Sequence, residues 1–386
     1  MIYLDSAATA RPLEYKNKSC PLDFEGSFFN PSALYSKEII KKIDDVREYV
    51  AHNLGVGKSE IYFTSGATES NNIAILGGVR QKNLSVVLSS GEHASVYEPA
   101  MHLKNKGYRV ELAEINKDTT INQADFIKLA SSNCGFASLI HVSNETGAIN
   151  DVESIFTAIK KKNPNVILHS DGVQGFLRQD INLKKMGVDL YSISGHKIGA
   201  PKGIGILYIK KGVVVNPLVF GGSQEKCIRA GTENVESILA LAGCIKEYKA
   251  LYKKVDSKDL RDVFLETISV EAKELSVKIV FTSDNSLSFA PNIVSMSVIG
   301  CKSEILQRVL MDKDNIYIGI GSACAASKKS NRVLESAKKP KYEVESNLRI
   351  SFDLSTKTEE VKFAAKQIVL RASEMLKGRL KVKCPN

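Results

Sequence analysis

Three polar side chains come a few residues after short apolar runs that are typical of buried β-strands. They are His93, Asp171 and Lys197. In an open α/β sheet, ligands bind beyond the carboxyl ends of the strands, so these side chains are candidates for one site. A lysine amine can form a Schiff base, a carboxylate can hold a protonated ring nitrogen, and a histidine can stack on a ring or exchange protons. Together these residue types indicate pyridoxal phosphate as a cofactor.

A turn rich in small residues follows another of these runs. Residues 65–72 read SGATESNN and lead into a helix-like stretch. Backbone N–H groups at such a turn, and the positive end of a helix, favour a phosphate group. Ser, Thr and Asn also cap many helices that bind nothing, so the turn alone leaves both interpretations open. A single lysine, aspartate or histidine is equally open, because most are surface residues, helix caps or structural residues.

The elements that must position these residues follow an α/β pattern. Six short β-rich runs alternate with helix-like stretches, which predicts a mostly parallel sheet covered by helices. The runs are residues 61–64, 85–88, 139–142, 166–169, 190–193 and 204–208. Apolar residues at helical spacing predict packed helices over residues 39–50 and 235–245. After about residue 255, a charged helix, strands at residues 277–280 and 293–298, and two more helices indicate a smaller domain.

Length and composition predict a two-domain cytosolic protein. The chain has 386 residues, of which 43% are hydrophobic. No apolar run approaches the roughly 18 residues needed to span a bilayer, and the first residues lack the layout of a signal peptide. Seven scattered cysteines without metal-binding spacing indicate neither a disulfide framework nor a zinc site.

The formal net charge of +10 raises the question of an acidic partner such as RNA. Lysines occur in short dispersed clusters, for example at residues 160–162, and no basic stripe is interleaved with aromatic residues. We therefore interpret part of the charge as solvated lysine and do not expect direct nucleic-acid binding.

Seven segments, in this order, closely resemble the cysteine desulfurases of class V of the pyridoxal-phosphate aminotransferases, the group that includes bacterial NifS and IscS. They are residues 3–9 (YLDSAAT), 30–33 (NPSA), 63–72 (FTSGATESNN), 194–197 (SGHK), 229–234 (RAGTEN), 321–324 (GSAC) and 347–352 (NLRISF). The resemblance implies the α/β fold type I of pyridoxal-phosphate transferases. A large cofactor-binding domain with a mostly parallel seven-stranded sheet would span residues 12–255. A smaller α+β domain would comprise residues 1–11 and 256–386.

The resemblance also implies roles for the matched residues around the cofactor ring. Lys197 is expected to form the Schiff base, Asp171 to pair with the pyridinium nitrogen, and Gln174 to hydrogen-bond the ring hydroxyl. His93 is expected to stack on the ring and to take part in catalysis.

Further residues are expected to bind the phosphate and the substrate. Additional cofactor contacts are implied for Ala67, for the phosphate-binding Thr68, Ser194 and His196, and for Thr232, which would reach the phosphate of the other subunit in a homodimer. Asn144 and Arg349 are expected to bind the substrate carboxylate, because a guanidinium offers two parallel hydrogen bonds. Asn144 is expected to contact the cofactor as well.

The implied reaction converts L-cysteine into L-alanine. Lys197 would take the α-proton, and the thiolate of Cys324 would attack the substrate sulfur to leave a persulfide on the enzyme. Cys324 lies among small and polar residues that suit a mobile loop, whereas most free cysteines are small buried residues. Its GSAC setting favours the nucleophile.

The stretch after Cys324 resembles the group of this family that has a long catalytic loop. Residues 328–330 further resemble forms dedicated to tRNA thiolation in Gram-positive bacteria. We therefore expect sulfur delivery to a docked acceptor protein, either a tRNA sulfurtransferase or an Fe–S scaffold. The alternatives are a selenocysteine lyase, another class V enzyme, or a non-catalytic platform for a partner or tRNA. Cys324 argues against a plain transaminase, and the complete set of reactive residues argues against a platform.

Overall fold

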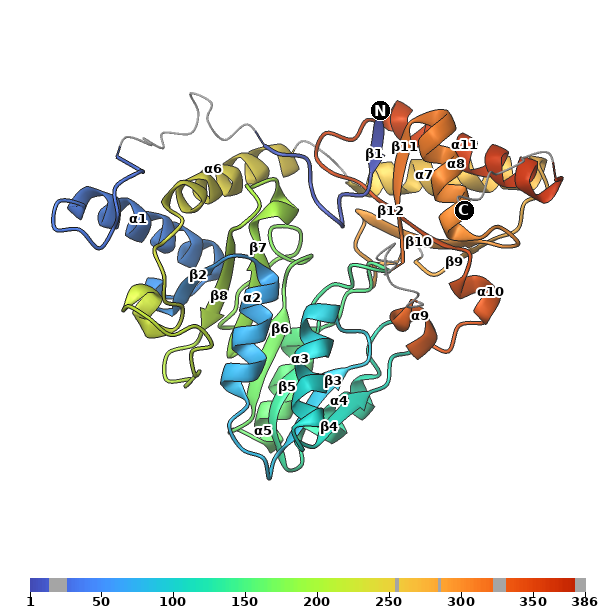
Figure 1. Ribbon diagram of the computed structural model, residues 1–386. Coiled ribbons are helices and arrows are strands. Elements are labelled where there is room, and N and C mark those ends of the chain that lie inside the picture. The colour runs from blue at the N-terminus through green and yellow to red at the C-terminus, as the bar shows by residue number, and fades with distance from the viewer. Residues whose placement is uncertain (14–25, 254–256, 284–285, 322–330, 379–386) are drawn as a thin grey trace.

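The structure, a computed structural model, describes residues 1–13, 26–253, 257–283, 286–321 and 331–378. The described chain forms two lobes, each built around its own β-sheet (Figure 1). The larger lobe contains the elements from α1 (Lys37–Leu54) to α6 (Val235–Tyr252). The smaller lobe contains the C-terminal elements together with β1 (Ile2–Leu4). The domain boundaries at residues 11 and 255 stay predictions.

The larger sheet has seven strands, as predicted. Their spatial order is β2 (Ile61–Thr64), β8 (Gly205–Ile209), β7 (Leu190–Ser194), β6 (Ile167–Asp171), β5 (Cys134–Ser138), β3 (Ser85–Ser89) and β4 (Val110–Ala113). All neighbours are parallel except β8, which runs antiparallel to both β7 and β2. The six other strands therefore point the same way, and their carboxyl ends lie along one edge of the sheet.

Helices cover both faces of this sheet. Successive strand side chains point to opposite faces, so Val87 packs in one apolar cluster and Val86 in another. The first cluster contains α1, α4 (Gln123–Ala130), α5 (Val152–Lys162) and α6; the second contains α3 (Ala94–Asn105) and the π-helical turn Ile73–Gly77 that continues α2 (Ala67–Asn72). The helices predicted over residues 39–50 and 235–245 are confirmed as parts of α1 and α6.

The smaller sheet has five strands. Their order is β1, β11 (Ile316–Ile320), β12 (Asn347–Ser351), β10 (Ile293–Val298) and β9 (Ile279–Phe281). Only the pair of β1 and β11 is parallel. The helices α7 (Ser257–Glu274), α8 (Ser303–Asp314) and α11 (Thr358–Leu376) bury their apolar side chains in the same cluster as this sheet. The sequence prediction found β9 and β10 but not β1, β11 or β12.

One predicted strand, residues 139–142, is wrong in position, because β5 ends at Ser138. Side chains take over the backbone groups of Ile140, which a strand would pair with a neighbour. Its N–H donates to Oε1 of Glu92 at 2.8 Å, and its C=O accepts from Nδ2 of Asn150 at 2.7 Å. The apolar run is therefore buried without forming a strand.

Among the described helices, none combines the length and the apolar composition that crossing a bilayer requires.

Candidate active site

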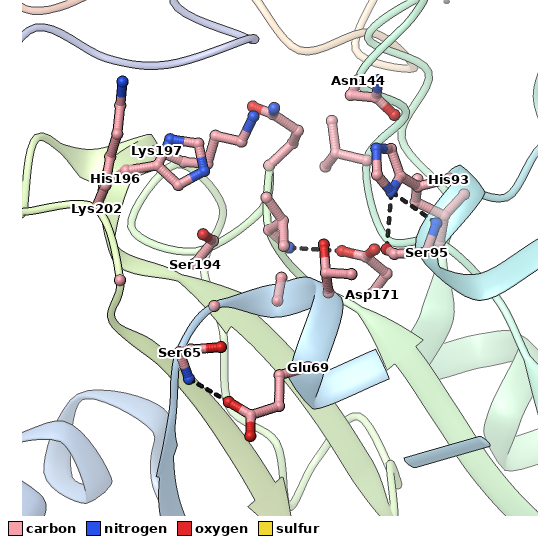
Figure 2. A pocket seen from close by; sticks show the side chains of 18 residues that line it. Ser65, Glu69, His93, Ser95, Asn144, Asp171, Ser194, His196, Lys197 and Lys202 are labelled. Carbon is pink, nitrogen blue, oxygen red and sulfur yellow. Dashed lines mark hydrogen bonds between the residues drawn. The ribbon is translucent and has the colours of Figure 1, made fainter. Parts of the chain in front are cut away.

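A cavity of about 370 Å³ lies at the carboxyl edge of the larger sheet. Figure 2 shows the side chains of Lys197 and His196 on one side of it and those of His93 and Asn144 on the other. Nine of the residues predicted from the sequence line this cavity. They are Ala67, Thr68, His93, Asn144, Asp171, Gln174, Ser194, His196 and Lys197.

Lys197 follows β7 in a short 3₁₀ turn, Gly195–Ile198. Its Nζ donates to the carbonyl oxygens of Ala7 and Ala8, both at 2.7 Å. Burial, with a smaller contribution from the positive charges of Arg349 and Arg178, lowers the pKa of Lys197 to about 8. A larger share of this amine is therefore uncharged, and nucleophilic, near neutral pH than in an ordinary lysine.

Asp171 is the last residue of β6 and is 3% exposed. One carboxylate oxygen accepts from Nδ2 of Asn71 at 2.8 Å, and the other accepts from the N–H of Val173 at 3.0 Å. These bonds compensate for the burial of the carboxylate and fix its position at the cavity wall. It can therefore face a cationic ring nitrogen.

His93 caps the N-terminus of α3. Its Nδ1 accepts from the N–H of Ser95 at 3.1 Å and lies 2.8 Å from the hydroxyl of that residue. Nδ1 acts as an acceptor, so a neutral ring carries its proton on Nε2. Burial lowers the pKa of His93; Lys197 and Arg332 act in the same direction, whereas Asp171 and Glu145 oppose it. The ring is nevertheless open to the cavity itself.

The turn after β2 forms another part of the cavity wall. The N–H of Ser65 donates to Glu69 at 2.5 Å, and Nε of Arg229 donates to the same carboxylate at 3.1 Å. Behind the turn passes β8, where a Cβ at Gly205 would lie 2.5 Å from Cα of Gly66. Only glycine allows this close approach. Glu69 lies within the motif singled out in the sequence, yet sequence reasoning gave it no role.

His196 and Lys202 line the cavity beside this turn. Nδ1 of His196 lies 3.0 Å from Oγ1 of Thr9. Burial lowers the pKa of His196 to about 4, with contributions from Lys197 and Lys202. The first-turn N–H groups of α2, hydroxyls and a nearby lysine give this region the chemistry of an anion site.

Arg349 projects from β12 toward Asn144. Its guanidinium donates to the carbonyl oxygen of Asn144 at 3.0 Å and to Oδ1 of Asp5 at 2.7 Å. Its Nε is buried and has no hydrogen-bond partner among the described residues. A Cβ at Gly319 would lie 2.8 Å from this nitrogen, so glycine leaves room for the guanidinium. An incoming carboxylate could use the donors of Arg349.

Two of the predicted site residues that the structure describes, Arg349 and Thr232, do not line this cavity, although Arg349 contacts the cavity-lining Asn144. Thr232 lines a separate, smaller cavity of roughly 200 Å³, together with Ser65 and Arg229. Cys324 lies outside the described residues. The chain before and after it, at Gly321 and Asn331, is described: a Cβ at Gly321 would lie 1.8 Å from Nδ2 of Asn331 and 3.3 Å from Oε2 of Glu145. Both positions are therefore close to the residue that follows the cavity-lining Asn144.

The donor set of the cavity fits the predicted cofactor. It combines an amine with a lowered pKa, a buried carboxylate, an aromatic ring with one fixed acceptor, and a region suited to an anion. Pyridoxal phosphate requires an amine for its aldehyde, a carboxylate for its ring nitrogen and donors for its phosphate.

Comparisons with known proteins support the same interpretation. The model of the family described as aminotransferase class-V matches residues 2–363. A cysteine desulfurase IscS from Dictyoglomus turgidum is 31% identical over 371 residues, which cover 94% of this chain and 92% of that protein. The solved structure of a NifS-like protein has a TM-score of 0.85 at 27% identity, covering 98% of this chain and 99% of its own. SspA in complex with cysteine has a TM-score of 0.75 at 27% identity, covering 91% and 99%.

Proposed function

Because this chain belongs to the aminotransferase class-V family, with the fold type I of its pyridoxal-phosphate enzymes, we propose that it is a cysteine desulfurase. It converts L-cysteine into L-alanine and takes up the sulfur as a persulfide on Cys324. The observation that carries this proposal is the cavity in which Lys197, Asp171 and His93 face one another. The name of the Dictyoglomus turgidum relative and the cysteine bound to SspA support the choice of substrate.

When bound, pyridoxal phosphate supplies an aldehyde that condenses with primary amines and a protonated ring that withdraws electrons from the substrate α-carbon. Lys197 would hold it covalently, Asp171 would pair with its ring nitrogen, Gln174 would contact its ring hydroxyl and His93 would cover its ring. Thr68, Ser194 and His196, with Ala67 next to them, would hold its phosphate group.

The side chains of this protein then bind the substrate and move its protons. Arg349, with Asn144, binds the carboxylate of cysteine, which replaces Asp5 as a partner of the guanidinium. Lys197, with its lowered pKa, removes the α-proton as a general base, and neutral His93 can relay a proton from Nε2.

Cys324 performs the sulfur transfer. Its thiolate attacks the substrate sulfur, so that a sulfur–sulfur bond forms and the carbon–sulfur bond of the substrate breaks. The electron pair of the broken bond stays with the substrate carbon, which gains a proton to become the methyl group of alanine. The sulfur then passes to an acceptor protein, a tRNA sulfurtransferase or an Fe–S scaffold, in the cytoplasm.

Two chains are proposed to form the working enzyme. An apolar patch, formed by Phe28, Leu34, Tyr35 and Phe220, is 72% or more exposed at each residue. Gln224 donates to Ser32, which connects the two segments that carry the patch. A patch of this kind is typical of an interface. Phe220 lies on the segment between β8 and α6 that also carries Thr232, which the sequence analysis assigns to the phosphate of the other subunit.

Replacing Phe220 by aspartate is expected to convert the dimer into a monomer, because a carboxylate would be buried in the interface. Size-exclusion chromatography with light-scattering detection measures the molar mass of the wild-type protein and of the variant. Leu287→Asp is the matched control, since Leu287 is 94% exposed and lies outside the patch. A wild-type chain that is monomeric at micromolar concentration would contradict the proposal.

The proposed activity is tested on the wild-type protein by its absorbance between about 300 and 500 nm, before and after cysteine is added. We expect a cofactor band that shifts while alanine accumulates, with sulfide released when a thiol reductant is present. A protein that stays colourless and inert with added pyridoxal phosphate would refute the proposed function.

A further inference from the structure

Helix α9 (Arg332–Ser336) brings a cation to the turn that ends in His93. The guanidinium of Arg332 donates to the backbone carbonyl oxygens of Ser90 and Glu92. Its Cζ also lies 4.2 Å from the ring centroid of Tyr97, in the first half of α3. Arg332 thus contacts the chain on both sides of His93, across about 240 positions of sequence.

The helix that carries Arg332 is itself held firmly. Asn331 caps it, with its side-chain oxygen accepting from the N–H of Leu334 at 3.2 Å. Val333 and Ala337 are buried in the main apolar cluster of the larger lobe. Because packing fixes the position of this helix, Arg332 can restrain the turn that it contacts.

The turn in question connects to the rest of the cavity through hydrogen bonds. His93 accepts from Ser95, and Nδ2 of Asn71 donates to the hydroxyl of Ser95 at 2.8 Å and to Asp171 at 2.8 Å. Glu92, which is 0% exposed, binds the N–H of the cavity-lining Ile140. A displacement of the turn would therefore move the His93 ring relative to Asp171.

We propose that Arg332 is a positioning residue for His93: its two carbonyl contacts and its stacking on Tyr97 hold the His93 ring in its working orientation. A planar guanidinium suits this task, because it can donate to two carbonyl oxygens and stack at the same time. The effect on turnover rests on the proposed function, whereas the effect on the turn does not.

The charge of Arg332 has a second consequence for His93. The charged groups that act on this imidazole are Asp171, Lys197, Glu145 and Arg332, and the positive charge of Arg332 helps to keep its pKa low. Removing that cation should raise the pKa of His93. If Arg332 served packing alone, its removal would leave the pKa of His93 unchanged. A shift of this pKa therefore distinguishes a role at His93 from a role in packing.

The test compares Arg332→Met and Arg332→Lys with the wild-type holoenzyme. In Arg332→Met we expect kcat for cysteine to fall about tenfold with KM changed less than about twofold. Hydrogen exchange at the amides of residues 95–97 should become at least about tenfold faster, and the pKa of His93, measured by NMR, should rise. Arg332→Lys keeps the positive charge but loses the planar guanidinium that donates to two carbonyl oxygens. It should therefore restore the pKa of His93 but only part of kcat. Lys338→Met, which removes an exposed cation just after α9, is the control.

Unchanged kcat and unchanged exchange at residues 95–97 in Arg332→Met would overturn the inference. So would faster exchange throughout the chain with a matching loss of thermal stability, since Arg332 would then support the fold generally. If the wild-type protein does not turn over cysteine, the proposed function fails, and the exchange and the pKa of His93 still decide whether Arg332 positions the turn.

Discussion

Replacing Lys197 by alanine is expected to lower alanine formation from cysteine by at least about a thousandfold, because the proposed function assigns to this one amine both the covalent attachment of the cofactor and the removal of the α-proton. The purified variant should also lose the protein-bound cofactor band. Lys185→Ala is the matched control, because Lys185 is exposed and does not line the cavity. Turnover by Lys197→Ala within tenfold of wild type would exclude the assigned role.

The same amine predicts a pH dependence for cofactor uptake by the wild-type protein freed of cofactor. Only the uncharged amine attacks an aldehyde, and the pKa of Lys197 is lowered from 10.5 to about 8. The uptake rate should therefore rise with pH and level off above about pH 8. At neutral pH the uncharged fraction is roughly 300-fold larger than for an ordinary lysine. A rate that keeps rising to pH 10 would show that burial does not lower this pKa.

Sequence reasoning found most of the cavity because parallel strands impose a simple rule. Residues that follow different strands, such as His93, Asp171 and Lys197, must meet at one edge of the sheet whatever the lengths of the connections. Their identities then indicated the chemistry. Apolar runs also predicted five of the seven strands, β2, β3, β6, β7 and β8, because strands buried on both faces read as continuous apolar runs. The number seven came from the family resemblance, since no run predicted β4 (Val110–Ala113) and the run at residues 139–142 follows β5.

The contacts that sequence reasoning missed depend on tertiary structure. Arg332 reaches the turn before His93 only because α9 packs into the core of the other lobe, and a single arginine before two apolar residues carries no local signal of that. The misplaced strand at residues 139–142 has the same origin. Its apolar pattern is that of a strand, and the N–H groups of Leu139 and His141 do bond to β6. The backbone of Ile140, however, bonds to the side chains of Glu92 and Asn150, where a second neighbouring strand would have paired with it.

Replacing Cys324 by serine is expected to separate cofactor binding from sulfur transfer. The cofactor band should remain, because the residues proposed to hold the cofactor lie on other segments of the chain, but alanine release should fall about a thousandfold, since a hydroxyl is a far weaker nucleophile than a thiolate. Intact-mass spectrometry without reductant should find one added sulfur on the wild-type chain after cysteine, and none on the variant.

The control for this thiol is Cys227→Ser, because Cys227 is exposed and free among the described residues. Cys227 follows two residues with positive φ and itself has a φ of 65°, a conformation that serine adopts no less readily than cysteine. Wild-type turnover and sulfur uptake by Cys227→Ser, together with their loss in Cys324→Ser, would identify the persulfide carrier. The reverse pattern would assign the persulfide to Cys227, on the segment between β8 and α6 that also carries Thr232, and would refute the role proposed for Cys324.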